Sequence, residues 1–303
     1  MKKDKYSHPV KAFFIRTVWW LLSRLPLKWL QALAVPIAAM IWRFVQRERH
    51  LSQVNVGLAF PHLDVKQRDQ LARQSLIEST RTMLEMGYMW MAPAAKVLSS
   101  VQKVQGAELL DLARQQGKPI ILLGPHIGQW EMLGQWLPQQ LLLTSMYSPP
   151  RIRELDSLIR NGRCRTGGKL VPADVKGVAG LLKALKRGEA VGILPDQVPD
   201  AGQGGVFAPF YGHPAMTATL LPKLVQKTGA RVFTALAKRL PAGAGYELIL
   251  IPADERVYDP DEVIAATGVN ASVEQIIAYA PDQYQWAYKR FKRVPEGSRN
   301  PYK

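Results

Sequence analysis

Residues 119–133 read PIILLGPHIGQWEML and predict a buried strand, a tight turn and the start of a helix in immediate succession. The opening run PIILLG is apolar without interruption, which is typical of a strand covered on both faces of a sheet. Gly124 and Pro125 then favour a turn, and GQWEMLGQWLPQQ (128–140) has a helical pattern. His126 is therefore expected just past the carboxyl end of a strand, where α/β folds gather their functional groups.

The same alternation continues along the rest of the chain. From about residue 101 onward, apolar runs of strand length alternate with segments of helical pattern. Such alternation predicts an α/β fold with a mostly parallel or mixed central sheet flanked by helices. Strands are expected at 101–106, 119–124, 141–147, 190–195, 231–240 and 246–252, and helices at 107–116, 128–140, 153–165, 177–188, 217–229 and 272–292.

Residues 51–98 are expected to be helical, with a break at Pro61 and His62. Asp64 suits the N-cap of the second helix, because its carboxylate can accept hydrogen bonds from the first free backbone N–H groups. Pro93 is expected to end that helix.

The N-terminal segment is basic and rich in tryptophan. Its longest uncharged run, residues 29–42, is shorter than a spanning helix of about 20 apolar residues. Tryptophan among arginine and lysine suits helices that lie in the headgroup region of a membrane. We therefore expect residues 1–50 to be membrane-anchor helices and residues 51–303 to be the main domain. The alternative is an amphipathic helix pair packed on the core, and the sequence leaves open whether residues 11–46 span a bilayer or lie flat.

The composition narrows the class of partner. Lysine and arginine number 40 against 24 acidic residues, which gives a formal net charge of +16 and fits a polyanionic partner. Nucleic-acid readers combine basic patches with stacking aromatic residues or a recognisable module, whereas the tryptophans here cluster near the N-terminus, so no nucleic acid is expected. A single cysteine, Cys164, excludes internal disulfides and multi-thiolate zinc sites, and the scattered histidines predict no metal site.

His126 and Glu131 form the first candidate site. With His126 in the turn, its ring can fold back over the start of the following helix toward Glu131. A carboxylate on one imidazole nitrogen fixes the tautomer and leaves the other nitrogen to take a proton, as activation of a hydroxyl requires. The alternative is a histidine with a structural role, because an acid so close in sequence is a common coincidence.

The stretches RNGRCRTGG and ILPDQ supply further candidates. The guanidinium groups of Arg160, Arg163 and Arg165 can grip phosphates or a developing oxyanion. A solvated helix face is the alternative, and it is preferred for Arg160. Asp196 and Gln197 follow another expected strand, where the aspartate either caps a turn or orients an arginine or a substrate amide.

Taken in order along the chain, these stretches resemble the lipid A biosynthesis late acyltransferases. That family contains lauroyl and myristoyl transferases of the lysophospholipid-acyltransferase-like superfamily, which carry a His-x4-Asp/Glu box. The resemblance covers about residues 10–295. The matching motifs are NVGLAFP (55–61), GPHIGQWE (124–131), RNGRCRTG (160–167), LLKALKRGEAVGILPDQ (181–197), GGVFAPFYGHPAMTAT (204–219) and APDQYQWAYKRFK (280–292).

The resemblance implies a glycerolipid-acyltransferase-like fold, in which residues 51–303 are the acyltransferase domain. It implies that His126 is the general base and that Glu131 is its orienting partner. Backbone N–H groups after the strand, or an arginine, are expected to hold the tetrahedral oxyanion. The positions that match the remaining family motifs, and that are expected to bind substrate, are Arg163, Arg165, Asp196 and Gln197.

The resemblance also implies the partners. The acyl donor is expected to be an acyl carrier protein thioester and the acceptor a hydroxyl of an acylated lipid A precursor, with no metal or organic cofactor. The expected location is the cytoplasmic face of the inner membrane, where the basic surface meets an acidic carrier protein and anionic lipids. Two alternatives remain: an acyltransferase for another membrane glycolipid or a lysophospholipid, and a non-enzymatic, basic membrane-binding protein.

Overall fold

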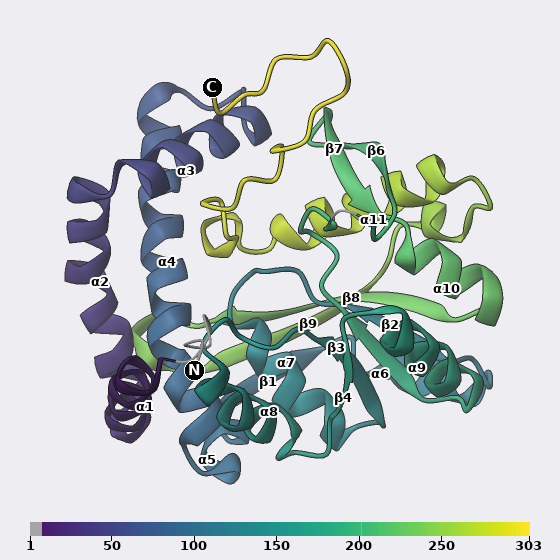
Figure 1. Cartoon of the computed structure of the whole chain (residues 1–303), viewed down its shortest axis with the longest axis horizontal. Helices are drawn as coiled ribbons and strands as arrows, with labels where there is room; N and C mark the ends of the chain where they lie inside the picture. The colour runs from purple at the N-terminus through teal and green to yellow at the C-terminus, as the bar shows by residue number, and fades with distance from the viewer. Residues whose placement is uncertain (1–7, 201) are drawn as a thin grey trace, which may run out of the picture.

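A central sheet of seven strands organises the chain in the computed structural model, which describes residues 8–200 and 202–303 (Figure 1). The strand order is β1-β9-β8-β2-β5-β3-β4, and β6 with β7 forms a separate hairpin. The strands are β1 (Val101–Gln105), β2 (Ile120–Leu123), β3 (Leu143–Tyr147), β4 (Lys169–Pro172), β5 (Ala190–Ile193), β6 (Gly205–Phe210), β7 (His213–Ala218), β8 (Arg231–Arg239) and β9 (Tyr246–Pro252).

The sheet is mixed and mostly parallel, which confirms the predicted fold class. β2 pairs in parallel with β5 and β8, and β3 pairs in parallel with β4 and β5. β9 runs antiparallel to β8 and carries β1 at the edge of the sheet. All side chains of β2 are buried, as expected for a central parallel strand covered on both faces.

Helices cover both faces of the sheet. The side chains of β2 alternate, so that Ile120 and Leu122 pack toward α4, α5, α6 and α7, while Ile121 and Leu123 pack toward α9, α10 and α11. The helices are α1 (Pro9–Arg24), α2 (Leu27–Phe44), α3 (Gln46–Ala59), α4 (Val65–Met91), α5 (Ala94–Leu98), α6 (Glu108–Gln115), α7 (Trp130–Trp136), α8 (Asp156–Cys164), α9 (Val175–Lys186), α10 (Leu220–Thr228) and α11 (Glu262–Ile277).

The N-terminal helices pack side by side against the long helix α4 (Figure 1). Asp64 caps α4 as expected: its carboxylate accepts the backbone N–H of Gln67, and the Gln67 side chain accepts the N–H of Asp64. Helix α3 runs across residue 50, and the division of the chain at that position stays a prediction.

No single helix among the described residues is long and apolar enough to cross a bilayer. Helices α2 and α3 together meet that length and composition, but they are bent by 93° at the break between them. The membrane association of the N-terminal helices therefore stays a prediction.

The helix expected over residues 272–292 is wrong in its second half. Helix α11 ends at Ile277, and Pro281 starts a short 3-10 turn, because a proline cannot supply the N–H that continues an α-helix. The chain then becomes extended, and Tyr284 forms an antiparallel bridge with Ile127. Strand β4 and the β6–β7 hairpin were not predicted from the sequence.

A buried ionic cluster ties α4 to the sheet. The guanidinium of Arg239, at the end of β8, donates to Glu78 (2.7 Å) and to Glu85 (2.8 Å). Burial alone would lower the pKa of Arg239, but its contacts with Glu85 and Glu78 raise the pKa above its ordinary value, so the group stays charged. Glu85 also accepts from Gln31 of α2 and from Gln129, which follows the His126 turn.

Replacing Arg239 with methionine should destabilise the fold strongly. The change leaves Glu78 and Glu85 buried without their cation, which typically costs about 3–5 kcal/mol. The matched control is Lys223→Met, which removes an exposed pair with Glu262 and should cost at most about 1 kcal/mol. Denaturant unfolding in detergent measures both, and equal losses would contradict the role of the buried cluster.

Candidate active site

His126 and Asp196 leave the sheet at the ends of two adjacent parallel strands. Leu123 lies opposite Ile193 at the end of the β2–β5 ladder, and each polar side chain belongs to the third residue beyond its strand. The backbone N–H of Gly124 still donates to the Ile193 carbonyl (2.9 Å), so the two chains remain together into their turns. Because parallel strands end at the same edge of the sheet, the two side chains meet there.

Asp196 holds His126 through two hydrogen bonds. Its Oδ1 lies 2.9 Å from His126 Nδ1, and its Oδ2 accepts the backbone N–H of His126 at 2.9 Å. Burial of this carboxyl raises its pKa, but attraction to His126 and the hydrogen bonds from it prevail, so the pKa of Asp196 is lowered. An ionised Asp196 can only accept a hydrogen bond, so His126 Nδ1 carries the proton. The lone pair of the neutral imidazole is then on Nε2.

The other side of the imidazole is partly open. Gln197 Nε2 lies 3.1 Å from His126 Nε2, and the Gln197 side chain is exposed. Trp130 meets the His126 ring edge-on, with 4.9 Å between ring centroids. The His126 ring is therefore held at Nδ1 and on one face. Nε2 faces the exposed side chain of Gln197, which a substrate can displace.

Glu131 is not the partner of His126, and that prediction is wrong. Its carboxylate accepts from Arg163 Nε (3.0 and 3.1 Å) and Nη2, and from Trp90 Nε1 (2.9 Å). The physical reason is the turn: Gly128 adopts a φ of 58°, and Glu131, the second residue of α7, lies on the side of that helix that faces α4 and α8. The acid on the ring comes from the neighbouring strand instead.

Arg163 stays charged at the edge of a pocket. Burial lowers its pKa, but the attraction and hydrogen bonds of Glu131 raise it above the ordinary value. The guanidinium also lies 5.5 Å from the ring of Tyr147 and 5.8 Å from that of Trp90. Arg163 is thus a charged group whose position is fixed by Glu131, as a role in stabilising an anion requires.

Arg165 was expected to bind substrate, but its guanidinium is bonded to other groups of the protein. Its Nε donates to Gln135 (3.0 Å), and its terminal nitrogens donate to the carbonyls of Met89 (2.6 Å) and Ala92. These carbonyls belong to the end of α4, so Arg165 satisfies a helix C-terminus. Its position supports a structural role.

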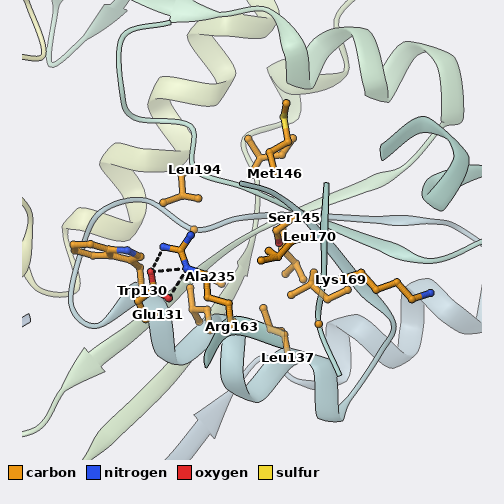
Figure 2. A pocket seen from close by; sticks show the side chains of 18 residues that line it. Trp130, Glu131, Leu137, Ser145, Met146, Arg163, Lys169, Leu170, Leu194 and Ala235 are labelled. Atoms are coloured by element: carbon orange, nitrogen blue, oxygen red, sulfur yellow. Dashed lines mark hydrogen bonds and ion pairs between the residues drawn. The ribbon is translucent and has the colours of Figure 1, made fainter. Parts of the chain in front are cut away.

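An apolar pocket lies beside the His126 turn, with a cavity volume of about 100 Å³. Figure 2 shows Arg163 and Glu131 joined at one side of it, next to Trp130, while Lys169 extends away from it. Most of the lining is aliphatic, and it includes Leu133, Leu137, Leu143, Leu170, Ile193 and Leu194. A hydrocarbon chain fits such a lining.

Comparison with known proteins identifies the family of the chain. A family model described as bacterial lipid A biosynthesis acyltransferase matches residues 1–293. The chain belongs to this family. The enzyme is therefore an acyltransferase of lipid A biosynthesis.

Three curated relatives illustrate the similarity. A lipid A biosynthesis lauroyltransferase of Escherichia coli (strain K12) is 29% identical over 92% of this chain and 90% of its own. A lipid A biosynthesis palmitoleoyltransferase of the same strain is 29% identical over 94% and 92%, respectively. A lipid A biosynthesis acyltransferase of Haemophilus influenzae (strain ATCC 51907 / DSM 11121 / KW20 / Rd) is 28% identical over 91% and 86%.

The C-terminal segment of the acyltransferase clamps the His126 turn, which sequence reasoning missed. Gln285 donates its backbone N–H to the His126 carbonyl (3.0 Å), and the Gln283 carbonyl accepts from Gly128 (3.1 Å). The N–H groups of residues 127 and 129 bond to the carbonyls of Pro125 and Ala237. These N–H groups of the turn are occupied and cannot also bind an oxyanion.

Exchanging the two carboxylates for amides separates their roles in the acyltransferase. Asp196→Asn should lower kcat by about 10²–10⁴-fold with little change in KM, because the isosteric amide no longer stabilises a positively charged His126. Glu131→Gln should also lower kcat, but by a smaller factor, because it loosens Arg163, the expected oxyanion partner, and leaves His126 held. Steady-state kinetics of acyl transfer measures both, and near-normal kcat in Asp196→Asn would contradict the assignment of Asp196.

Proposed function

We propose that the enzyme transfers a fatty acyl chain from an acyl carrier protein thioester to a hydroxyl of an acylated lipid A precursor, with His126 as general base. The observation that carries the proposal is the Asp196-held imidazole beside an apolar pocket. Trp130 links the imidazole and the pocket, because its ring contacts His126 and lines the pocket. A proton acceptor and a site for a hydrocarbon chain therefore lie next to each other, as the transfer of an acyl chain requires.

The reaction follows from the tautomer. His126 Nε2 takes the proton of the acceptor hydroxyl while the hydroxyl oxygen attacks the carbonyl carbon of the thioester. Asp196 stabilises the imidazolium that forms. The carbonyl oxygen becomes an oxyanion, for which Arg163 is the proposed cation. When the intermediate collapses, the C–S bond breaks, the ester remains on the acceptor, and the imidazolium returns its proton to the thiolate.

The location proposed for the reaction is the cytoplasmic face of the inner membrane. Its support is the exposed apolar surface of α1 and α2, on which Phe14, Trp29 and Phe44 are between 65% and 74% exposed. Arg24 lies 4.8 Å from the ring of Trp20, a pairing that suits the lipid headgroup level. The positive net charge of the chain favours both an acidic carrier protein and anionic lipids.

His126→Ala should abolish acyl transfer without unfolding the protein. Loss of a positioned base lowers the rate by about 10²–10⁴-fold, and the side chain lies at a partly open site and not in the packed core. The measurement is mass-resolved product formation from a panel of acyl carrier protein thioesters, with a tetra-acylated lipid A precursor and a lysophospholipid as competing acceptors. Near-normal turnover by a folded His126→Ala variant would refute His126 as the general base. A preference of the wild-type enzyme for a lysophospholipid acceptor would refute the lipid A precursor as the substrate.

Gly134→Met should shift donor preference toward shorter chains. Gly134 lines the apolar pocket, and a Cβ added to it has open space around it, so a longer side chain at this position is expected to reduce the cavity. Gly134→Ala is the matched control and should change chain preference little. Competition between donors of different length measures the shift, and an unchanged preference in Gly134→Met would remove this pocket as the donor-chain site.

A further inference from the structure

A second cavity opens on the other side of the catalytic turn. It is a groove between α2, α3, α4 and the C-terminal segment, with a volume of about 510 Å³. None of its lining residues also lines the apolar pocket described above. Its apolar wall consists of Ile37, Ile41, Leu76, Met83, Leu84 and Ala287.

The groove extends to Gln197, the side chain that contacts the basic nitrogen of His126. Gln197 lines it, and the Gln197 amide lies 3.1 Å from His126 Nε2, the position that an attacking hydroxyl must take. Gln285 also lines it and donates its backbone N–H to the His126 carbonyl. A ligand in the groove therefore meets Nε2 by displacing one exposed amide side chain.

The outer part of the groove lies on the apolar N-terminal helices. Ile37 and Ile41 belong to α2, whose neighbouring residue Met40 is 57% exposed, and Met83 across the groove is 56% exposed. Met83 extends the apolar wall of the groove to the protein surface, where a hydrocarbon chain can cover it. A lipid that resides in the membrane reaches this groove along α2.

The groove also holds an unused hydrogen-bond acceptor. Glu48 Oε2 is buried and has no hydrogen-bond partner among the described residues, while Oε1 of the same carboxylate pairs with Arg47. Both side chains line the groove. A buried acceptor of this kind needs a donor, such as an amide N–H or a sugar hydroxyl, to offset the loss of water.

We propose that this groove binds a hydrocarbon chain of the acceptor lipid and presents the hydroxyl on that lipid to His126 Nε2. The inference rests on the proposed function and divides the substrates between two cavities. The donor chain occupies the apolar pocket beside Trp130, and the acceptor chain lies against α2 and α4. Gln197 holds the position of the acceptor hydroxyl until the acceptor displaces it, and Glu48 binds a polar group of the same lipid.

Two substitutions on α4 test the groove. Ser79→Phe fills it, and Met83→Glu places a charge on its apolar wall at an exposed position that tolerates polar side chains. Gln70→Phe is the matched control, because Gln70 is an exposed α4 residue outside the groove. Steady-state kinetics with the acyl carrier protein thioester and the lipid A precursor, each varied in turn, gives the KM of both substrates.

The expected result is a rise of at least about 10-fold in acceptor KM for both groove variants, with donor KM unchanged and Gln70→Phe like the wild type. Unchanged acceptor KM in Met83→Glu would overturn the inference, and a rise in donor KM alone would assign the groove to the donor. Failure of the wild-type enzyme to acylate the lipid A precursor is a separate outcome, because it overturns the proposed function itself.

Discussion

The hydrogen-bonded pair of Asp196 and His126 is the interaction on which the site depends. It exists because β2 and β5 are adjacent, parallel and in register, so that residues at equal distances beyond their ends face each other. Asp196 also acts electrostatically on Arg290, a buried cation that donates to Thr217 and Asn270. Burial lowers the pKa of Arg290, whereas the charge of Asp196 is among the influences that raise it.

The surrounding structure restricts the motion of the histidine. The C-terminal segment bonds to both ends of the His126 turn, and Gln129 connects that turn to Glu85 in the buried cluster around Arg239. Groups held before the substrate arrives need no reorganisation during the reaction, which is a general source of rate enhancement. The free Nε2 side, by contrast, is bordered by an exposed glutamine and by two cavities of different character.

The sequence predicted the fold class, the bounds of most elements after residue 101 and the position of His126 at a strand end. It also placed Asp196 beyond another strand. It could not pair them, because strand order in a sheet depends on long-range packing that no local pattern records. The resemblance to a family with a His-x4-Asp/Glu box implied Glu131 instead, but the turn at Gly128 directs that side chain toward Arg163. The helical expectation over residues 272–292 failed for a local reason, Pro281, and the residues beyond it pair with the His126 turn.

The central claim is that Asp196 fixes the tautomer of His126. Nitrogen-15 NMR of histidine-labelled enzyme in detergent, recorded at a pH where the ring is neutral, reports which imidazole nitrogen carries the proton. We predict a proton on Nδ1 and a lone pair on Nε2 in the wild type, with loss of this preference in Asp196→Asn. A proton on Nε2 in the wild-type enzyme would contradict the account, because such a ring cannot take a proton from the acceptor at that nitrogen.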